Sequence, residues 1–296
     1  MAPADAVRRR RAPVLTRRAP RARSVGERPV ESDAAVRRIA ALLRRGTFNV
    51  VLTGAGVSTE SGLPDFRSKG GLWSGIDPTR VASLSAFQSD PQAFYAFYQT
   101  RLAGLAGAAP NAAHRAIARL EGLGAVHLVV TQNVDGLHQQ AGSRDVVEVH
   151  GNLREARCAG CGAIRPIAEM AGPLRSGTLP RCAACGGLLR PNVVLFEELL
   201  PAAAYERAVS ACETCRVLLV VGSSLQVYPV AGLPALAARQ GARLAIVNRE
   251  PTPLDGQADA VVRADAGAAL SRIADAVASD RPDQRRSTRG VGRSRA

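Results

Sequence analysis

The chain is poor in lysine, in aromatic residues and in long apolar segments. Lys69 is its one lysine, and phenylalanine, tryptophan and tyrosine together make up 4% of the 296 residues. No stretch has the eighteen or more apolar residues of a membrane-spanning helix, so we expect no membrane contact. No apolar segment follows the Arg-rich N-terminus, which argues against a secretory signal, although such a leader also resembles an organelle transit peptide. The sequence therefore predicts a cytoplasmic protein.

Positive charge is concentrated at the two ends of the chain. The formal net charge is +14, of which residues 1–28 contribute +7 and residues 281–296 contribute +5. We interpret residues 1–30 and 280–296 as Arg-rich, disordered tails. A weak, salt-dependent contact of these tails with nucleic acid is the alternative. The apolar fraction of 46% is enough for one folded domain with a small added module over residues 31–279.

Short apolar runs alternate with helical patterns along residues 31–279. The expected strands cover residues 48–52, 126–131, 146–149, 217–221, 244–247 and 260–262. The expected helices cover residues 31–45, 91–105, 111–123, 201–211 and 230–240. This alternation predicts an α/β fold with a Rossmann-like, doubly wound parallel sheet. Residues from about 153 to 190 are rich in Cys, Gly and Pro and look like a small inserted module.

Two Cys-x-x-Cys pairs lie in this module with twenty residues between them. Their members are Cys158, Cys161, Cys182 and Cys185. The spacing is typical of a zinc ribbon, in which four thiolates complete the tetrahedron and make the metal structural. Two reactive dithiols are the alternative. A third pair, Cys212 and Cys215, follows an expected helix, and we interpret its members as ordinary, partly buried thiols.

Gly54-Ala55-Gly56 stands at the end of the first expected strand. Glycines at this place let the backbone turn sharply and let a phosphate approach the chain. The usual dinucleotide spacing puts a third glycine where this chain has Thr59, so a purely structural turn is an equally good interpretation.

Polar side chains follow two further expected strands. Residues 131–138 read Thr-Gln-Asn-Val-Asp-Gly-Leu-His, and such groups at strand ends are where an open α/β sheet binds ligands. Helix capping by Asn133 or Asp135 is the alternative. His150 follows the next strand and is suited to act as a general base near neutral pH, unless it is merely a hydrogen-bonded histidine.

Together these motifs resemble the sirtuin family of NAD-dependent protein deacetylases and deacylases, in its bacterial form. Residues 54–67 resemble the opening motif of the family, residues 131–138 its second motif and residues 150–152 its third. The four cysteines follow in the expected order, and residues 222–229 and 247–250 complete the set. The resemblance covers about residues 31–279 and implies a sirtuin catalytic domain between the two tails.

The resemblance implies that the chain transfers the acyl group of an acylated lysine in a protein or peptide to ADP-ribose. NAD would be consumed and nicotinamide released, while one zinc ion would have a structural role. Two other functions remain open. One is mono-ADP-ribosyl transfer to a protein side chain, and the other is a polyanion-binding scaffold with weak catalysis.

The resemblance also implies roles for individual residues. His150 would be the base that acts on the ribose hydroxyl, and Asn133 and Asp135 would hold the nicotinamide and the ribose. Phe66 would cover the nicotinamide pocket, and Arg67 would contact the pyrophosphate. The residues implied to contact NAD are Gly54, Ala55, Gly56, Thr59, Asp65, Phe66, Arg67, Gln132, Asn133, Asp135, Gly222, Ser223, Ser224, Asn248 and Glu250.

The substrate peptide is implied to pair as an extended strand between residues 194–197 and 226–228. The side chains and backbone that would contact it belong to Val194, Phe196, Gln226 and Val227. Here the chain departs from the family pattern, because Glu197 stands where a Phe-Gly-Glu run has glycine. We expect the added charge to favour basic peptides.

Tyr98 and Arg101 are three residues apart on an expected helix, so both lie on one face. The same spacing in some sirtuins binds the carboxylate of succinyl- or malonyl-lysine, and a guanidinium matches a carboxylate in a bidentate way. A surface arginine beside a core tyrosine is the alternative.

Overall fold

Six parallel strands form the central sheet of the computed structural model, which describes residues 33–66, 68 and 71–279. The strands are β1 (Asn49–Thr53), β2 (Leu128–Thr131), β3 (Val146–Glu148), β7 (Val217–Val221), β8 (Arg243–Val247) and β9 (Ala260–Val262). Their order in the sheet is β3-β2-β1-β7-β8-β9, and every neighbouring pair is parallel. The order reverses between β1 and β7, which is where a doubly wound sheet opens a crevice for ligands. The predicted fold class is confirmed.

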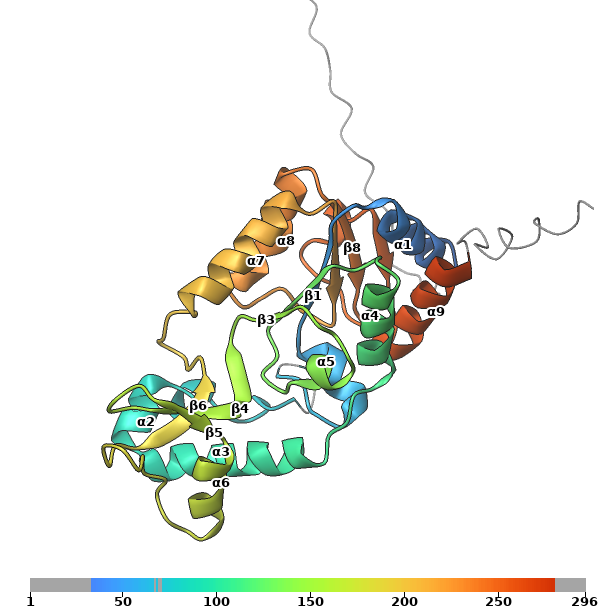
Figure 1. Ribbon diagram of the computed structural model, residues 1–296. Coiled ribbons are helices and arrows are strands. Elements are labelled where there is room, and N and C mark those ends of the chain that lie inside the picture. Colours follow the sequence, from blue (N-terminus) through green and yellow to red (C-terminus); the bar gives the residue numbers. More distant parts are fainter. Residues whose placement is uncertain (1–32, 67, 69–70, 280–296) are drawn as a thin grey trace, which may run out of the picture.

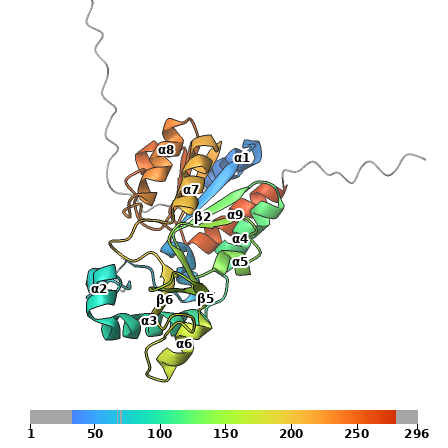
Figure 2. The same ribbon diagram turned by 60° about the vertical axis from the view of Figure 1, so that its left-hand side comes forward.

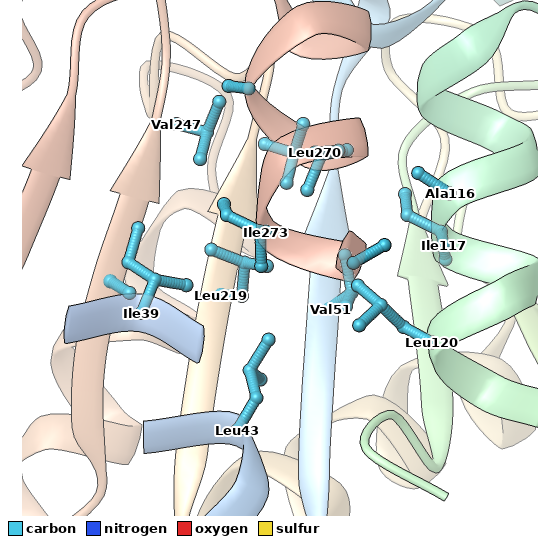
Figure 3. Close-up of a cluster of buried hydrophobic side chains, with 14 of the residues drawn as sticks. Ile39, Leu43, Val51, Ala116, Ile117, Leu120, Leu219, Val247, Leu270 and Ile273 are labelled. Carbon is cyan, nitrogen blue, oxygen red and sulfur yellow. The ribbon is translucent and has the colours of Figure 1, made fainter. Parts of the chain in front are cut away.

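Helices cover both faces of this sheet (Figure 1). One face packs against α1 (Asp33–Arg45), α4 (Ala112–Gly122) and α9 (Ala266–Ser279), and the other against α7 (Ala202–Thr214) and α8 (Leu233–Arg239). Strand side chains alternate between the two layers, so that Val51 packs with the first group of helices and Val50 with the second. Figure 3 shows the first layer, where Leu120 and Ile273 meet Val51.

A second, antiparallel sheet lies beside the first, as both ribbon views show (Figures 1 and 2). Its order is β5-β4-β6, with β4 (Gly151–Cys158), β5 (Ile164–Pro166) and β6 (Leu189–Val193). Three helices pack with it, namely α2 (Leu84–Ser89), α3 (Pro91–Ala106) and α6 (Ala168–Arg175). Phe94 and Tyr95 of α3 share a core with Leu153 and Leu189, and the Tyr95 hydroxyl donates to Leu189 O at 2.8 Å. The small module is therefore built from two separate stretches of chain.

Several short elements lie between the longer helices and strands. They are the 3-10 helices η1 (Ala55–Ser61), η2 (Pro78–Arg80), η3 (Val230–Gly232) and η4 (Asp255–Gln257), and the one-turn helix α5 (Leu137–Gln140). The helix expected over residues 230–240 is thus divided into η3 and α8. The helix expected to begin at residue 31 is described from Asp33, and both predicted tails lie outside the described residues. None of the described helices is long and apolar enough to cross a membrane.

The ends of β1 and β7 touch through their backbones. Gly54 N donates to Val221 O at 3.1 Å, and Gly56 N donates to Gly222 O at 2.9 Å. Gly222 has a φ of +59°, and a Cβ added there would lie 2.3 Å from Val57 N. A Cβ added at Gly54 or at Gly56 would lie 2.8 Å from Gly222 O. Glycine is therefore required at these positions by chain packing, before any ligand is considered.

We expect Gly222→Ala to lower the free energy of unfolding by roughly 2–4 kcal/mol. The new Cβ would strain the left-handed backbone conformation and would also clash with the backbone of Val57. Gly241→Ala is the matched control, since Gly241 also has positive φ but no atom within 4 Å of an added Cβ. It should lose about 1 kcal/mol. Urea denaturation of both variants measures the difference, and equal losses would contradict the importance of the backbone contact.

Candidate active site

A cavity of about 880 Å³ lies at the carboxyl ends of the central strands, between the two sheets. Its volume falls in the range of sites for small ligands and cofactors. The residues expected to contact NAD that line it are Gly54, Ala55, Gly56, Thr59, Asp65, Phe66, Gln132, Asn133, Gly222, Ser223, Ser224, Asn248 and Glu250. His150 lines it too, as do the six expected substrate residues Tyr98, Arg101, Val194, Phe196, Gln226 and Val227. Arg67 lies outside the described residues.

His150 follows β3 and is held by one ring nitrogen. Its Nδ1 lies 2.9 Å from Gln132 O, and since a carbonyl oxygen only accepts, Nδ1 carries the hydrogen and donates. Nε2 is then the nitrogen without a proton. Burial lowers the pKa of His150 from its usual 6.5, although the bond to Gln132 opposes this shift. The imidazole is therefore neutral at pH 7, as a proton acceptor must be.

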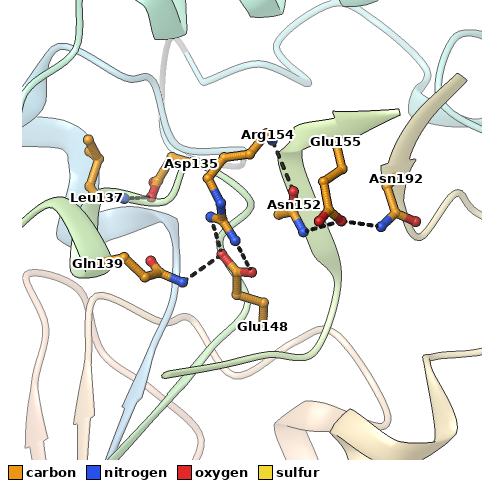
Figure 4. A network of polar contacts seen from close by, with 8 residues as sticks. All are labelled: Asp135, Leu137, Gln139, Glu148, Asn152, Arg154, Glu155 and Asn192. Carbon is orange, nitrogen blue, oxygen red and sulfur yellow. Dashed lines mark hydrogen bonds and ion pairs between the residues drawn. The ribbon is translucent and has the colours of Figure 1, made fainter. Parts of the chain in front are cut away.

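Ion pairs and hydrogen bonds from side-chain amides fix the chain on both sides of His150 (Figure 4). Glu148, at the end of β3, accepts two hydrogen bonds from Arg154 of β4, at 2.7 and 2.6 Å, and a third from Gln139 of α5. Glu155 accepts from the side chains of Asn152 and Asn192, which joins β4 to β6. The backbone that carries His150 is thus tied to both sheets.

Asp135 is not among the residues that line the cavity, whereas Asn133 is. Its Oδ2 accepts from Ser58 Oγ at 2.7 Å, and its Oδ1 accepts from Leu137 N at 2.9 Å (Figure 4). Ser58 also accepts from Asn133 Nδ2 at 3.0 Å. Asp135 therefore orients Ser58 and Asn133 from below the cavity.

Two buried histidines lie beneath the same network, and the sequence analysis did not single them out. His114 Nε2 lies 3.4 Å from Ser58 Oγ, and His138 Nε2 lies 3.0 Å from Thr53 Oγ1. Burial is the main cause that lowers the pKa of His114 to about 4 and that of His138 to about 3. Both imidazoles are neutral at pH 7. His114 is the third residue of α4, and its sequence position indicates only a role in capping that helix.

Stacked aromatic rings form one wall of the cavity. Trp73 stacks on Phe66 and on Phe97, with ring centroids 5.4 and 5.7 Å away, and meets the edge of Phe196 at 6.2 Å. The Arg101 guanidinium lies over the Phe66 ring of this wall, 5.6 Å from its centroid. Trp73 and Phe97 were missed because an aromatic residue in a loop or a helix does not by itself reveal which cavity it faces.

Arg101 and Tyr98 lie on the cavity side of α3. Burial raises the pKa of Tyr98, so its phenol is neutral at pH 7. Burial lowers the pKa of Arg101, yet a guanidinium keeps its charge in proteins. No described carboxylate forms an ion pair with Arg101. A partly buried guanidinium of this kind favours a ligand that brings its own negative charge.

The two segments expected to bind the peptide each contain or follow strained backbone. Glu197 has a φ of +75° and Leu225, next to Gln226, a φ of +54°. They are the two non-glycine residues with positive φ in the described part of the chain. Such strain tends to gather at binding sites.

The carboxylate of Glu197 is not free to contact a peptide, because both of its oxygens accept hydrogen bonds from Ser85. Its Oε2 accepts from Ser85 N at 2.9 Å, and its Oε1 accepts from Ser85 Oγ at 2.8 Å. A carboxylate engaged in this way is poorly placed to select basic peptides, so the expectation from the sequence needs revision.

The four predicted zinc ligands come together in the small module. Their sulfur atoms all lie within 4.8 Å of one another, and Cys158 and Cys185 are 3.4 Å apart. Zinc–sulfur bonds of about 2.3 Å in a tetrahedron require sulfur separations near 3.8 Å, so this donor set fits zinc. Backbone N–H groups of Cys161 and Gly160 donate to Cys158 and lower its pKa to about 6 despite an opposing effect of burial. Cys212 and Cys215 are buried elsewhere, and neither forms a disulfide.

The residues around the cavity also fit NAD. Gly54 and Gly56 leave backbone without side chains at the switch point, where a pyrophosphate approaches a doubly wound sheet. Asn133 Oδ1 is buried with no partner among the described residues, and an amide N–H of a ligand would satisfy it.

Comparison with known proteins gives a consistent picture. The model of the Sir2 family matches residues 54–229. NAD-dependent protein deacylase 2 of Pyrobaculum aerophilum is 44% identical over 243 residues, which are 81% of this chain and 94% of that protein. NAD-dependent protein deacetylase 1 of Geobacillus kaustophilus is 47% identical over 226 residues, or 76% and 90% of the two chains.

Solved structures agree. A Sir2 enzyme superposes with a TM-score of 0.79 at 42% identity, covering 84% of this chain and all (100%) of that one. A Sir2–p53 peptide–NAD+ complex gives a TM-score of 0.75 at 39% identity, covering 80% and 96%. The cavity, the four cysteines and these similarities lead to one conclusion: the chain belongs to the Sir2 family, the sirtuins.

Proposed function

We propose that the cavity binds NAD and an acyl-lysine side chain together and that His150 is the base of the reaction. The chain is an NAD-dependent protein lysine deacylase, as its family membership indicates. The observation that supports His150 most directly is its hydrogen bond to Gln132 O, which leaves a neutral imidazole with a free Nε2 beside the cavity. When bound, NAD supplies a ribose carbon that accepts the acyl oxygen as nicotinamide leaves.

The other residues hold and shield the reacting groups. Asn133 presents amide atoms to the nicotinamide, and Asp135 keeps Asn133 oriented through Ser58. Phe66 and Trp73 close the cavity with apolar rings and keep water from the reaction. Gly222, Ser223 and Asn248 border the part of the cavity beyond the switch point, where the adenosine half would lie.

The peptide would lie across the edge formed by residues 194–197 and 226–228. In the first segment, the backbone of Phe196 already pairs with Ala82 and Leu84. In the second, Val227 O accepts from Ala231 N. The backbone groups of Glu197 and the N–H groups of Val227 and Tyr228 have no hydrogen-bond partner among the described residues. These groups are the ones we assign to strand pairing with the peptide.

The acyl group is proposed to be an acidic one, succinyl or malonyl, in addition to acetyl. Arg101 is partly buried and lies next to the neutral phenol of Tyr98, and no described carboxylate lies within ion-pair distance of it, which supports this preference. Both groups donate hydrogen bonds, and a carboxylate at the end of the acyl chain accepts them.

Transfer of ADP-ribose to a protein side chain is the second candidate, since it would use the same NAD site. A mass gain of the protein product, instead of the loss of an acyl group, distinguishes it. The Arg-rich ends lie outside the described residues, so their contact with nucleic acid stays a prediction. A cytoplasmic location also stays a prediction, supported by four thiols arranged for a metal instead of disulfides.

His150→Asn should reduce kcat/KM for deacylation roughly 100- to 10,000-fold, because it removes the proton acceptor. The asparagine amide can still donate to Gln132 O, so the loop should keep its position. Mass spectrometry of an acetyl-lysine peptide incubated with NAD measures turnover, and calorimetry should show unchanged NAD binding. Turnover close to that of the wild type would contradict the role of His150.

Arg101→Met should lower kcat/KM for succinyl-lysine peptides roughly tenfold to 100-fold and leave acetyl-lysine peptides nearly unaffected. The loss follows from removing one charged partner of the acyl carboxylate. Arg119→Met is the control, because Arg119 is half-exposed and pairs with Asp275 on the outer helices. Equal losses with both acyl groups would show that Arg101 does not select the acyl chain.

Cys182→Ser should remove zinc and destabilise the small module, because three thiolates hold the metal less tightly than four. Metal analysis of the purified chain should give about one zinc per wild-type molecule and much less in the variant. Cys212→Ala serves as the comparison and should retain its zinc, since Cys212 lies in the core against the other sheet. Zinc lost equally from both variants would rule out the four-cysteine site.

A further inference from the structure

Glu197 occupies a backbone conformation that favours glycine, yet it is not a glycine. Its φ is +75°, and its side chain extends from the loop after β6 to the start of α2. Side chains other than glycine are strained in the left-handed region, so the chain needs a compensating interaction to hold this one there.

The compensating interaction is a pair of charge-assisted hydrogen bonds. Both carboxylate oxygens of Glu197 are used, one by Ser85 N and the other by Ser85 Oγ, at 2.9 and 2.8 Å. Ser85 lies in the first turn of α2, where backbone N–H groups have no partner within the helix. The bonds thus join two segments that are 112 residues apart in the sequence.

Backbone bonds strengthen the same junction. Phe196 N donates to Ala82 O at 3.0 Å, and Leu84 N donates to Phe196 O at 3.1 Å, as in a parallel bridge between Ser83 and Phe196. Together with the Glu197 side chain, these bonds hold residues 196–197 against the start of α2. We call this junction, made by residues 82–85 and 196–197, the loop clamp.

The loop clamp controls two parts of the cavity. It sets the position of Phe196, whose ring centroid lies 6.2 Å from that of Trp73 in a T-shaped contact and continues the aromatic wall. It also sets the direction of the Glu197 peptide groups, which have no hydrogen-bond partner among the described residues. A peptide strand that pairs with Glu197 needs these groups in one fixed direction.

We propose that Glu197 is a positioning residue for the substrate peptide: its carboxylate holds Ser85 so that its own backbone is prepared for strand pairing. This inference rests on the proposed binding of the peptide along residues 194–197. Because the loop is ordered before the peptide arrives, less conformational entropy is lost on binding. The side chain therefore acts on peptide affinity through the loop, and not through a charge contact with the peptide.

The test compares Glu197→Gly, Glu197→Gln and Ser85→Ala in the full chain. Peptide KM and kcat are measured at saturating NAD, with acetyl-lysine peptides flanked by arginine or by glutamate. Glu197→Gly should raise KM roughly three- to tenfold for both peptides with kcat unchanged, because the loop loses two hydrogen bonds and gains backbone freedom. Glu197→Gln retains an acceptor and should recover part of this loss, and Ser85→Ala should lie between Glu197→Gly and the wild type.

Ser89→Ala is the matched control. Ser89 is an exposed serine of the same helix, and its hydroxyl donates only to Ser85 O within α2. Its KM values should equal those of the wild type. A rise in KM restricted to the arginine-flanked peptide, equal in Glu197→Gly and Glu197→Gln, would overturn the proposal and show direct recognition of charge.

A second measurement does not depend on substrate. Trp73 is the one tryptophan of the chain, so its fluorescence reports the position of Phe196. Without ligands, the emission of Glu197→Gly should differ from that of the wild type, and the emission of Ser89→Ala should not. Unchanged emission together with unchanged peptide KM would overturn the proposal. A shifted emission in a chain that deacylates no peptide would show that the clamp exists and that the proposed function is wrong.

Discussion

The contact between the glycine turn after β1 and Gly222 after β7 is the constraint on which the cavity depends. The segments that follow β1 and β7 stay together, because the backbone of the glycine turn contacts the backbone of Gly222 directly. This contact brings the ends of β1 and β7 into the floor of one cavity. Gln132 joins the same point, because its side chain donates to Ser223 Oγ at 2.9 Å. Since Gln132 O in turn holds His150, the position of that imidazole follows from the packing of the glycine turn.

The loop at Glu197 is held differently. There strained backbone is fixed by two hydrogen bonds from Ser85 to the Glu197 carboxylate at the surface. Close packing leaves no alternative position, whereas hydrogen bonds at the surface can exchange with water and open locally. The glycine turn is thus rigid by sterics, and the loop at Glu197 is ordered by bonds that one substitution can release.

Much of the fold could be predicted because the strands are short, apolar and separated by amphipathic helices. The expected strands 217–221 and 260–262 coincide with β7 and β9. The zinc ligands were equally clear, because the spacing of Cys158 to Cys185 belongs to few other sites. The two-part origin of the small module was not predictable, because nothing in the pattern of α3 indicates that Phe94 packs on β4 and β6. The short α2 was missed for a related reason: its six residues carry too little periodicity, and its start depends on Ser83 and on the distant Glu197.

The roles of the polar residues were harder to predict than their location, because a motif does not show how deep each side chain lies. Asn133 and Asp135 are two positions apart, yet only Asn133 lines the cavity. The buried Asp135 accepts from Ser58, and Ser58 lies next to a neutral His114. If His114 and His138 were charged, two positive groups with ring centroids 4.9 Å apart would lie beneath the cavity. Burial prevents this by lowering the pKa of both rings, so neither histidine adds positive charge beneath the cavity. Positive charge instead faces the cavity from its wall, where Arg101 lines it.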